Sequence, residues 1–413
     1  MRNWQPDPAS PIITGIGVAT ALGFGKQAFQ DGLYTPRNVF GVMRRPGRQF
    51  PDSSSAFLGA ELPEPPDLLP GRVARTTGLT GRVAVAVIDE AWREAGLGDL
   101  EPETIGLVIG GSNVQAREHV LMQHAYSERL PFLSPHYGYG FLDTDLCGLC
   151  SSAFPIRGFA YTLGGASASG ALAVLHAADA VRSGRVQACI ALGALQDLSY
   201  FECQALRTLG AMGSGRFATE PDRACRPFDR DRDGFIFGES AAALVVRKRD
   251  GSAGAASSYG SIAGGAHIAD GTRGPEPSLA GEVRAIQLAL AQAGLRAGQI
   301  DYVNAHGTGS PLGDDTELAA YREAGLTHAR INATKSIIGH GLSAAGAVEL
   351  AAVLIQMRQG RLHATRNLDA PIDPSFHWVA GAAEPSAIRN ALKLSLGFGG
   401  IDAAVVLCAP EAP

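Results

Sequence analysis

The sequence is poor in the features that mark secreted, membrane-spanning or nucleic-acid-binding proteins. Its 413 residues include six cysteines, which do not make a disulfide scaffold in a chain of this length. No segment approaches the roughly 20 consecutive apolar residues of a membrane span, and residues 1–8 lack the apolar run of a secretory signal. The net charge is −5 and no lysine- or arginine-rich run occurs, which argues against nonspecific nucleic-acid binding. We therefore expect a cytoplasmic protein that binds neither nucleic acid nor membrane.

A metal site is not expected either. Cys147 and Cys150 form one Cys-x-x-Cys pair, but no second pair and no nearby histidine pair completes a zinc site. Metal or redox use of this pair is therefore the less favoured interpretation.

What the sequence does contain is alternating strand and helix patterns in both halves. Hydrophobic residues make up 46% of the chain, enough for an ample core. The patterns predict strands over 11–18, 105–110, 186–192, 241–246, 301–305 and 403–407, and helices over 82–95, 169–182, 281–294, 315–323 and 345–358. Residues 112–160 are aromatic and contain proline, which predicts an irregular excursion. We expect an α/β architecture with a helix-covered sheet in each half.

A polar stretch rich in glycine, serine and alanine at 250–258 is the best candidate for a domain boundary. It divides the chain into an N-terminal half, 1–255, and a C-terminal half, 256–413. The pattern alone gives only weak support for a duplicated domain.

Three glycine-rich segments each present one polar side chain. They are 164–170 with Ser167, 304–309 with His306, and 335–341 with His340. Glycines at this density let the backbone approach a ligand closely, and a fourth such segment, 397–400, could supply backbone N–H donors. One hydroxyl, two imidazoles and a glycine-rich turn predict polarisation of a carbonyl, as in acyl chemistry.

Ser167 precedes a predicted alanine-rich helix, where free backbone N–H groups and the helix dipole favour negative charge. The alternative is that Ser167 or Ser169 simply caps that helix. The hydrolase pattern Gly-x-Ser-x-Gly fails, because Ser169 stands where the second glycine is needed.

His306 follows a predicted strand and precedes Thr308 and Ser310, whose hydroxyls could hydrogen-bond an amide-bearing ligand. A lone histidine is usually structural, but a histidine between a strand and a glycine is a better site candidate.

Lys335 and Glu349 flank His340 in sequence. They could form a buried ion pair that orients this histidine. The alternative is a surface pair of little energetic value.

Five segments, in order along the chain, resemble those of β-ketoacyl-acyl-carrier-protein synthases: 13–17, 226–239, 304–317, 335–349 and 397–400. The resemblance covers nearly the whole chain. It implies a thiolase-like fold of two similar halves, each a mixed sheet covered by helices in an αβαβα arrangement. It also implies a homodimer without a tightly bound cofactor, acting on acyl chains carried by the phosphopantetheine of an acyl carrier protein.

The resemblance also implies roles for individual residues. His306 and His340 match the paired catalytic histidines, and Lys335 and Glu349 match their supports. Phe398 matches a gating residue whose N–H, with that of residue 167, forms the oxyanion hole. Thr308 and Ser310 lie where pantetheine contacts fall.

One departure from the family pattern predicts the reaction. Condensing members carry cysteine where this chain has Ser167; a helix N-terminus can ionise a thiol, whereas a hydroxyl needs a general base. The histidines and the oxyanion hole remain, and can stabilise the enolate that forms as a malonyl thioester loses carbon dioxide. We therefore expect decarboxylation of malonyl- to acetyl-carrier protein. This resembles the free-standing decarboxylating members that serve polyketide β-branching.

Two alternatives stay open. One is a condensing or acyl-transfer enzyme that uses Ser167 as its nucleophile. The other is a non-catalytic partner subunit resembling a chain-length factor, but such partners generally lose the histidines that this chain keeps. Two smaller departures, Ile401-Asp402 for Thr-Asn and Ser240 for glycine, put the local geometry near the oxyanion turn in doubt.

Overall fold

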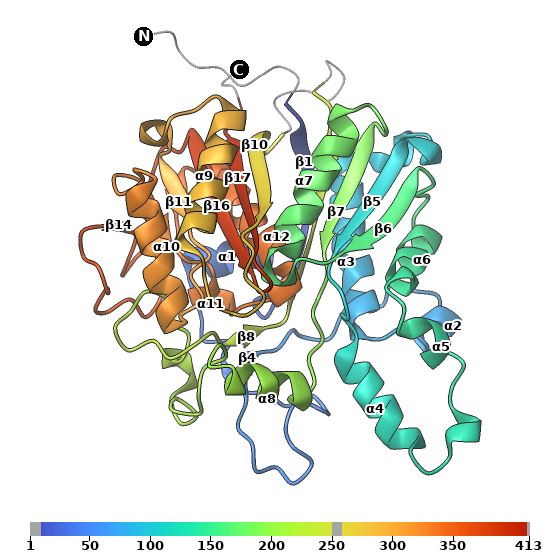
Figure 1. Ribbon diagram of the computed structural model, residues 1–413. Helices are drawn as coiled ribbons and strands as arrows, with labels where there is room; N and C mark the ends of the chain where they lie inside the picture. The colour runs from blue at the N-terminus through green and yellow to red at the C-terminus, as the bar shows by residue number, and fades with distance from the viewer. Residues whose placement is uncertain (1–9, 250–257, 411–413) are drawn as a thin grey trace.

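The computed structural model describes residues 10–249 and 258–410, and in these ranges the two halves build the same five-stranded arrangement (Figure 1). In the N-terminal half the strands lie in the order β1-β9-β7-β5-β6, and in the C-terminal half in the order β10-β17-β16-β11-β12. The pairing pattern is also the same in both halves. The antiparallel pairs are β1–β9 and β9–β7 in the N-terminal half, and β10–β17 and β17–β16 in the C-terminal half. The parallel pairs are β7–β5 and β5–β6 in the N-terminal half, and β16–β11 and β11–β12 in the C-terminal half. β1 and β10 pair through a short antiparallel contact that joins the halves.

The strands of the large sheet are β1 (Ile12–Thr20), β2 (Gly23–Phe24), β5 (Ile105–Gly110), β6 (Phe159–Leu163), β7 (Ala188–Gly193), β9 (Ser240–Arg247), β10 (Gly260–Ala269), β11 (Tyr302–Asn304), β12 (Arg330–Asn332), β14 (His377–Trp378), β16 (Asn390–Gly397) and β17 (Ile401–Cys408). Two small sheets hold β3 (Gly41–Val42), β4 (Leu58–Ala60), β8 (Phe237–Gly238), β13 (Arg361–Leu362) and β15 (Glu384–Pro385). The helices are α1 (Lys26–Tyr34), α2 (Gly71–Ala74), α3 (Leu79–Ala95), α4 (Ala116–Tyr126), α5 (Tyr137–Gly140), α6 (Thr144–Ala153), α7 (Ser169–Arg182), α8 (Tyr200–Thr208), α9 (Leu279–Ala293), α10 (Pro311–Glu323), α11 (Lys335–Ile338) and α12 (Ala345–Gln359).

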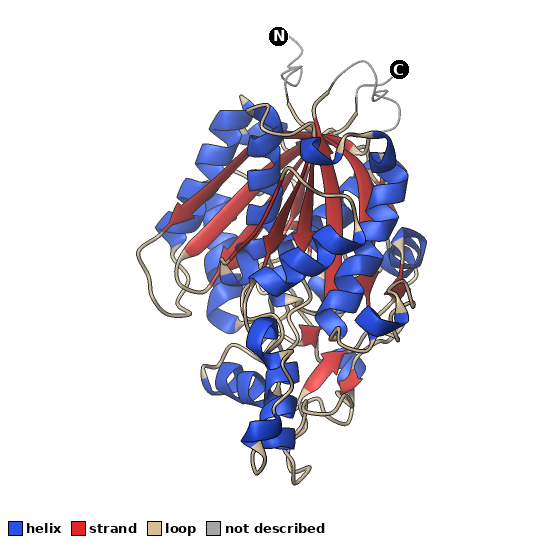
Figure 2. Ribbon diagram, turned by 90° about the vertical axis from the view of Figure 1, so that its right-hand side faces the viewer, coloured by secondary structure: helices blue, strands red, loops and turns tan. Residues whose placement is uncertain are grey.

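The sheets and helices form five layers, and Figure 2 shows the strands as a fan with helices packed around it. α7 and α12 lie between the two halves of the sheet, α3 covers the outer face of the N-terminal half, and α9 and α10 cover the outer side of the C-terminal half. Strand β9 shows that both faces of the sheet are buried. Its residues 242, 244 and 246 join the central core, while 241, 243 and 245 pack with α3 on the outer face. The expected thiolase-like αβαβα fold is confirmed.

The central helices cross at their first turns, where glycines allow contact between backbones. A Cβ at Gly170 of α7 would lie 2.7 Å from the backbone nitrogen of Ala347, and one at Gly346 of α12 would lie 2.5 Å from that of Ala171. The two contacts are reciprocal, so the starts of both helices are fixed against each other at the centre of the molecule.

The predicted strands and helices are present, with ends shifted by a few residues; the strand over 105–110 and the helix over 169–182 match without a shift. The predicted irregular excursion at 112–160 is wrong, since it contains α4, α5, α6 and the start of β6. α4 buries only Arg117 and Val120 and therefore has no apolar stripe, and β6 is a half-exposed edge strand. β10 and β16 were not predicted.

Two sequence predictions fall largely outside the described residues: the signal-free segment 1–8 and the boundary stretch 250–258, of which only Ser258 is described. The division into 1–255 and 256–413 stays a prediction. Within 10–249 and 258–410, no helix has both the length and the apolar character that a bilayer crossing requires.

Candidate active site

Ser167 lies in a 3-10 turn, Ala166–Ala168, directly before α7. The turn is tight enough to hold Ala166 at φ +46°, a left-handed conformation that is uncommon outside glycine. The local hydrogen bonds are made by the Ser169 hydroxyl, which accepts from the Gly165 N–H and donates to the Ala166 carbonyl. Ser167 is therefore not the helix cap, and its side chain points away from its own helix.

The Ser167 hydroxyl meets His340, with Oγ 2.9 Å from Nε2. The backbone N–H of Leu342 donates to Nδ1 of His340 at 3.3 Å. Burial, followed by the positive charge of Lys335, lowers the pKa of His340 well below its ordinary value. The ring is therefore neutral, and because Nδ1 accepts, its one proton is on Nε2 and is donated to Ser167 Oγ.

His306 lies beside His340, with ring centroids 5.4 Å apart and planes at 86°. Glu317 on α10 accepts hydrogen bonds from the backbone N–H groups of His306 and Gly307, at 2.6 and 2.8 Å, and so fixes the chain at this point. Burial, then the charge of Lys335, lowers the pKa of His306 well below its ordinary value. Lys335 Nζ lies 3.3 Å from Nδ1 of this ring, which leaves the proton on Nε2.

Lys335 and Glu349 form the buried ion pair that the sequence predicts, with Nζ 2.5 Å from Oε1 and each side chain 1% exposed. The pair contacts His306 and not His340: Lys335 also donates to the His306 carbonyl at 2.5 Å. The expected orientation of His340 by this pair is therefore wrong. The reason is that Lys335, the first residue of α11, reaches Nδ1 and the carbonyl of His306, while the Leu342 N–H orients His340.

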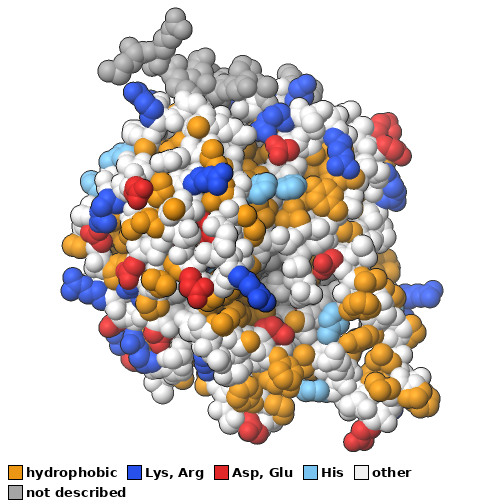
Figure 3. Space-filling model, viewed as in Figure 1, with side chains coloured by type: hydrophobic (Ala, Val, Ile, Leu, Met, Phe, Trp, Pro, Cys, Tyr) orange, Lys and Arg blue, Asp and Glu red, His pale blue; other side chains and the backbone are white. Residues whose placement is uncertain are grey.

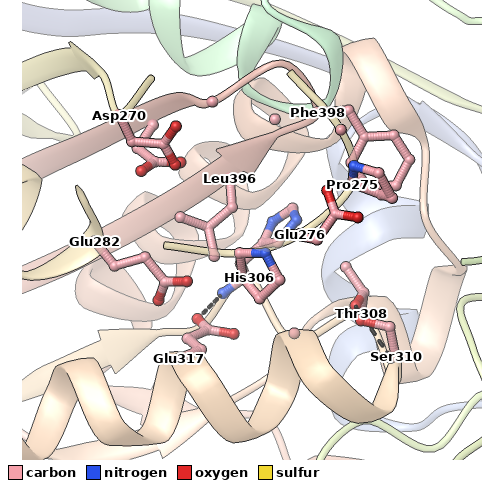
Figure 4. A pocket seen from close by; sticks show the side chains of 16 residues that line it. Asp270, Pro275, Glu276, Glu282, His306, Thr308, Ser310, Glu317, Leu396 and Phe398 are labelled. Atoms are coloured by element: carbon pink, nitrogen blue, oxygen red, sulfur yellow. Dashed lines mark hydrogen bonds between the residues drawn. The ribbon is translucent and has the colours of Figure 1, made fainter. Parts of the chain in front are cut away.

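An open cavity reaches this site (Figure 4). His306, Thr308, Ser310 and Phe398 line it together, with the Thr308 and Ser310 hydroxyls 3.0 Å apart. Ser167 and His340 do not line the cavity; they lie behind it, at 9% and 2% exposure. The cavity thus brings together the residues that the sequence assigns to ligand contact and one of the two paired histidines.

The far wall of the cavity is acidic; it contains Asp270, Glu282, Glu317 and Asp402. Burial, followed by the charge of Glu317, raises the pKa of Glu282 to about 10, and burial, then Asp270, raises that of Asp402 to about 7. Glu282 is therefore protonated at neutral pH, and the wall repels an anionic ligand less than its composition suggests.

The turn at 397–400 packs directly on the segment before Ser167, since a Cβ at Gly397 would lie 2.3 Å from the Gly165 carbonyl oxygen. Within the described residues, neither the Ser167 nor the Phe398 backbone N–H donates to another group. Both are therefore free donors, as an oxyanion hole requires.

Of the two smaller departures from the family pattern, Ser240 lies against the residue that follows His340. Ser240 is buried, its hydroxyl has no partner within the described part of the chain, and it lies against Gly341.

No group of three or more His, Cys, Asp or Glu side chains in residues 10–249 and 258–410 has a geometry that could hold a metal ion.

Sequence reasoning missed Lys393 on β16 and Glu317 on α10. Lys393 is completely buried, with Nζ 2.8 Å from the second carboxylate oxygen of Glu349. A lysine between leucines in an alternating strand normally predicts an exposed face, so the sequence held no signal for it. Glu317 is the last residue of segment 304–317, which resembles the synthase family, but its contacts with two backbone N–H groups depend on the fold.

Comparison with known proteins agrees with the site. The family models "Beta-ketoacyl synthase, N-terminal domain" and "Beta-ketoacyl synthase, C-terminal domain" match residues 11–251 and 259–369. The chain is 52% identical to the polyketide biosynthesis malonyl-ACP decarboxylase PksF of Bacillus subtilis, over 96% of this chain and 95% of that protein. It is 30% identical to a 3-oxoacyl-(acyl-carrier-protein) synthase 2 of Synechocystis, over 94% and 95%. A crystal structure of a β-ketoacyl synthase from Burkholderia phymatum superposes with a TM-score of 0.86 at 27% identity, over 97% and 99%. The chain belongs to the β-ketoacyl synthase family.

Proposed function

We propose that this protein decarboxylates malonyl-acyl-carrier protein to acetyl-acyl-carrier protein. The observation that carries the proposal is the contact between Ser167 Oγ and His340 Nε2 in a site that keeps both histidines. The printed activity of the Bacillus relative at 52% identity supports the same reaction.

In this reaction the phosphopantetheine arm enters the cavity past Thr308 and Ser310, whose hydroxyls bind its amides. The malonyl thioester then lies beside His306, with Phe398 at the entrance. Its carbonyl oxygen accepts hydrogen bonds from the Nε2–H group of His306 or from the backbone N–H groups of Ser167 and Phe398, because the Nε2–H of His340 is already donated to Ser167 Oγ.

Decarboxylation breaks the bond between the carboxylate carbon and the α-carbon of the malonyl group. Carbon dioxide leaves, and the electron pair moves onto the thioester oxygen as an enolate. N–H donors aimed at this oxygen stabilise the charge most as it develops. A proton from water then adds to the α-carbon and gives the acetyl thioester.

Ser167 does not act as a nucleophile in this scheme. A serine attacks a thioester only when a base takes its proton, and Nε2 of His340 already carries one. The hydroxyl is instead an acceptor for His340 and a donor for the substrate. The silent-partner alternative is disfavoured because both histidines and the ion pair that contacts His306 are intact.

The acyl carrier protein is the partner that this substrate requires. The edge strand β6 leaves one side of the sheet open, and the connection from β5 to β6 exposes Leu130, Phe132 and Phe141, in the part of the molecule where apolar side chains gather at the lower right of Figure 3. These features support a homodimer. Supply of acetyl-carrier protein for polyketide β-branching, in the cytoplasm, is the proposed biological role.

The test is incubation of the purified protein with malonyl-carrier protein in the absence of any acyl acceptor, followed by intact-mass analysis of both proteins. The expected result is loss of carbon dioxide from the carrier with no mass added to the enzyme. Unchanged malonyl-carrier protein would disprove the proposal.

The same intact-mass spectra distinguish decarboxylation from the alternative in which Ser167 acts as a nucleophile. A Ser167→Cys variant provides the positive control for adduct detection, because a thiol at a helix N-terminus accepts acyl groups readily. An acyl adduct on wild-type Ser167 that forms and turns over would favour the acyl-transfer enzyme instead.

A further inference from the structure

The strand β16 carries an unusual residue into the centre of the molecule. Lys393 is 0% exposed and lies on the inner face of the strand, opposite α12, while its neighbours Leu392 and Leu394 face the outer core. The chain has only four lysines, at 26, 248, 335 and 393, against 31 arginines. Two of these four lysines, Lys335 and Lys393, contact the same carboxylate, that of Glu349. Lysine brings a compact ammonium to this position, whereas arginine would bring a larger, planar guanidinium.

Glu349 is held by both lysines, one at each oxygen. Oε1 lies 2.5 Å from Lys335 Nζ, and Oε2 lies 2.8 Å from Lys393 Nζ. Lys393 also donates to the carbonyl of Leu394. Lys335 donates a hydrogen bond to Oε1, whereas Lys393 contacts Oε2 as an ion pair without hydrogen-bond geometry. A carboxylate bound at one oxygen rotates easily about its last torsion, and the positive charge beside the second oxygen restricts that rotation.

The chain of contacts ends at the catalytic ring. Lys335 has three N–H bonds, and it uses them on Glu349 Oε1, on the His306 carbonyl and on His306 Nδ1. The position of its ammonium therefore depends on the plane of the Glu349 carboxylate, and that plane depends on Lys393.

Burying an ammonium is unfavourable, and an apolar side chain at this position would be more stable if β16 only had to pack. Burial lowers the pKa of Lys393 to about 8, and Glu349 offsets part of that shift. The group is therefore mostly charged at neutral pH. With Lys335 and Glu349 it leaves one positive charge beneath His306.

We propose that Lys393 is a positioning residue for the decarboxylation: it fixes the second oxygen of Glu349, and through Lys335 it holds His306 with Nδ1 as acceptor and Nε2–H toward the cavity. The inference rests on the proposed function for its activity readout. It assigns to this chain a four-membered relay, His306–Lys335–Glu349–Lys393, in place of a simple ion pair.

The experiment compares Lys393→Met, which keeps the length of the side chain and removes its charge, with wild type. Displacement of a catalytic group by about 1 Å costs on the order of 10²-fold in rate, so we expect a fall in kcat approaching that size with little change in KM. Lys26→Met is the matched control, since it also breaks an ion pair, with Glu94, but on α1. Thermal unfolding confirms that the variants are folded, and Lys393→Gln is used if the methionine variant is not.

The pH profile gives a readout that loss of packing does not move. Burial lowers the pKa of His306 most, followed by Lys335, the neighbouring imidazole and Lys393, and Glu317 faces its backbone N–H. Removing one positive charge raises the pKa of His306, so the acid limb of the kcat profile shifts to higher pH in Lys393→Met. A folded variant with wild-type kcat and an unmoved profile overturns the proposal.

A double variant tests the route of the effect. If Lys393 acts through Glu349, Lys393→Met adds little further loss to Glu349→Gln, whereas an additive loss contradicts the relay. Histidine ¹⁵N spectra report the Nε2–H tautomer of His306 whether or not the protein turns over. Failure of wild-type decarboxylation would therefore disprove the proposed function alone, and an unchanged His306 signal in Lys393→Met would disprove the relay alone.

Discussion

The two halves of the molecule bring the same turn to its centre, but the two turns place their serine hydroxyls against different partners, an imidazole in one half and a backbone carbonyl in the other. Each turn precedes a central helix and contains a serine that follows a residue with positive φ, +46° in the N-terminal half and +51° in the C-terminal half. Ser167 Oγ meets His340 Nε2 at 2.9 Å, whereas Ser343 Oγ donates to the Ala194 carbonyl at 2.8 Å. The turn sets the position of each hydroxyl. The group that the hydroxyl contacts determines whether it can take part in chemistry.

The halves also contribute unequally to the site. The C-terminal half supplies both imidazoles, the two lysines that contact Glu349 and the turn with Phe398. The N-terminal half supplies the Ser167 hydroxyl and one free backbone N–H. A synthase that loads an acyl chain needs a nucleophile from the first half, whereas a decarboxylase needs mainly the donors of the second.

The largest expected effect comes from removing a donor of the C-terminal half. His306→Ala removes one N–H that faces the enolate oxygen, and loss of such a donor costs about 10²–10³-fold in kcat. Intact-mass assays of malonyl-carrier protein measure the rate. His306→Gln is the matched variant: it keeps an N–H donor and should lose less activity. A fall in rate smaller than that of Ser167→Ala would reverse the comparison and assign the chemistry to the N-terminal half.

The next effect concerns the crossing of the central helices, where the halves are equivalent. An added methyl at Gly170 or Gly346 meets a backbone nitrogen at 2.7 or 2.5 Å, which neither helix relieves without moving. We expect each alanine variant to lose about 3 kcal/mol in the free energy of unfolding, measured by urea titration. Gly138→Ala on α5, where a Cβ meets nothing within 4 Å, is the control. A large loss at only one of the two sites would show that the crossing is not reciprocal.

A smaller effect separates the two serines. Ser167→Ala removes one hydrogen-bonding group from the site, and we expect kcat to fall about tenfold with stability unchanged. Ser343→Ala should leave kcat unchanged and cost about 1 kcal/mol of stability, because the Ala194 carbonyl loses its donor. Both quantities are measured on both variants. Equal effects on kcat would contradict the functional difference between the turns.

The sequence predicts the parts of this comparison that depend on local chemistry. Glycines mark the turns that carry Ser167, His306 and His340, because only close backbone approach explains their density. The contact of Lys335 with His306 rather than with His340 could not be predicted. Lys335 is close to His340 in the sequence, but the fold places it against His306. Lys393 lies in a strand whose alternation suggests solvent on one side, and only the five layers reveal that both sides are covered.

The smallest expected effect is the response of kcat to mild acid. Burial and the charge of Lys335 lower the pKa of His306 and of His340 well below 6.5. Both rings therefore stay neutral as the pH falls through 6.5, and each keeps its single proton on Nε2. We expect kcat at saturating carrier protein to stay flat through this value, and to fall only when the pH drops through the lowered folded-state pKa.

This response belongs to the C-terminal half alone, because the Ser167 hydroxyl does not titrate in this range. Ser167→Ala should lower the whole kcat profile without changing its shape, since the two lysines still face the rings. A wild-type acid limb close to 6.5 would mean that both imidazoles are solvated and that the ammonium groups beneath them exert no field. A limb that moves in Ser167→Ala would instead show that the hydroxyl controls the protonation of His340, which would make the N-terminal half an active partner in the chemistry.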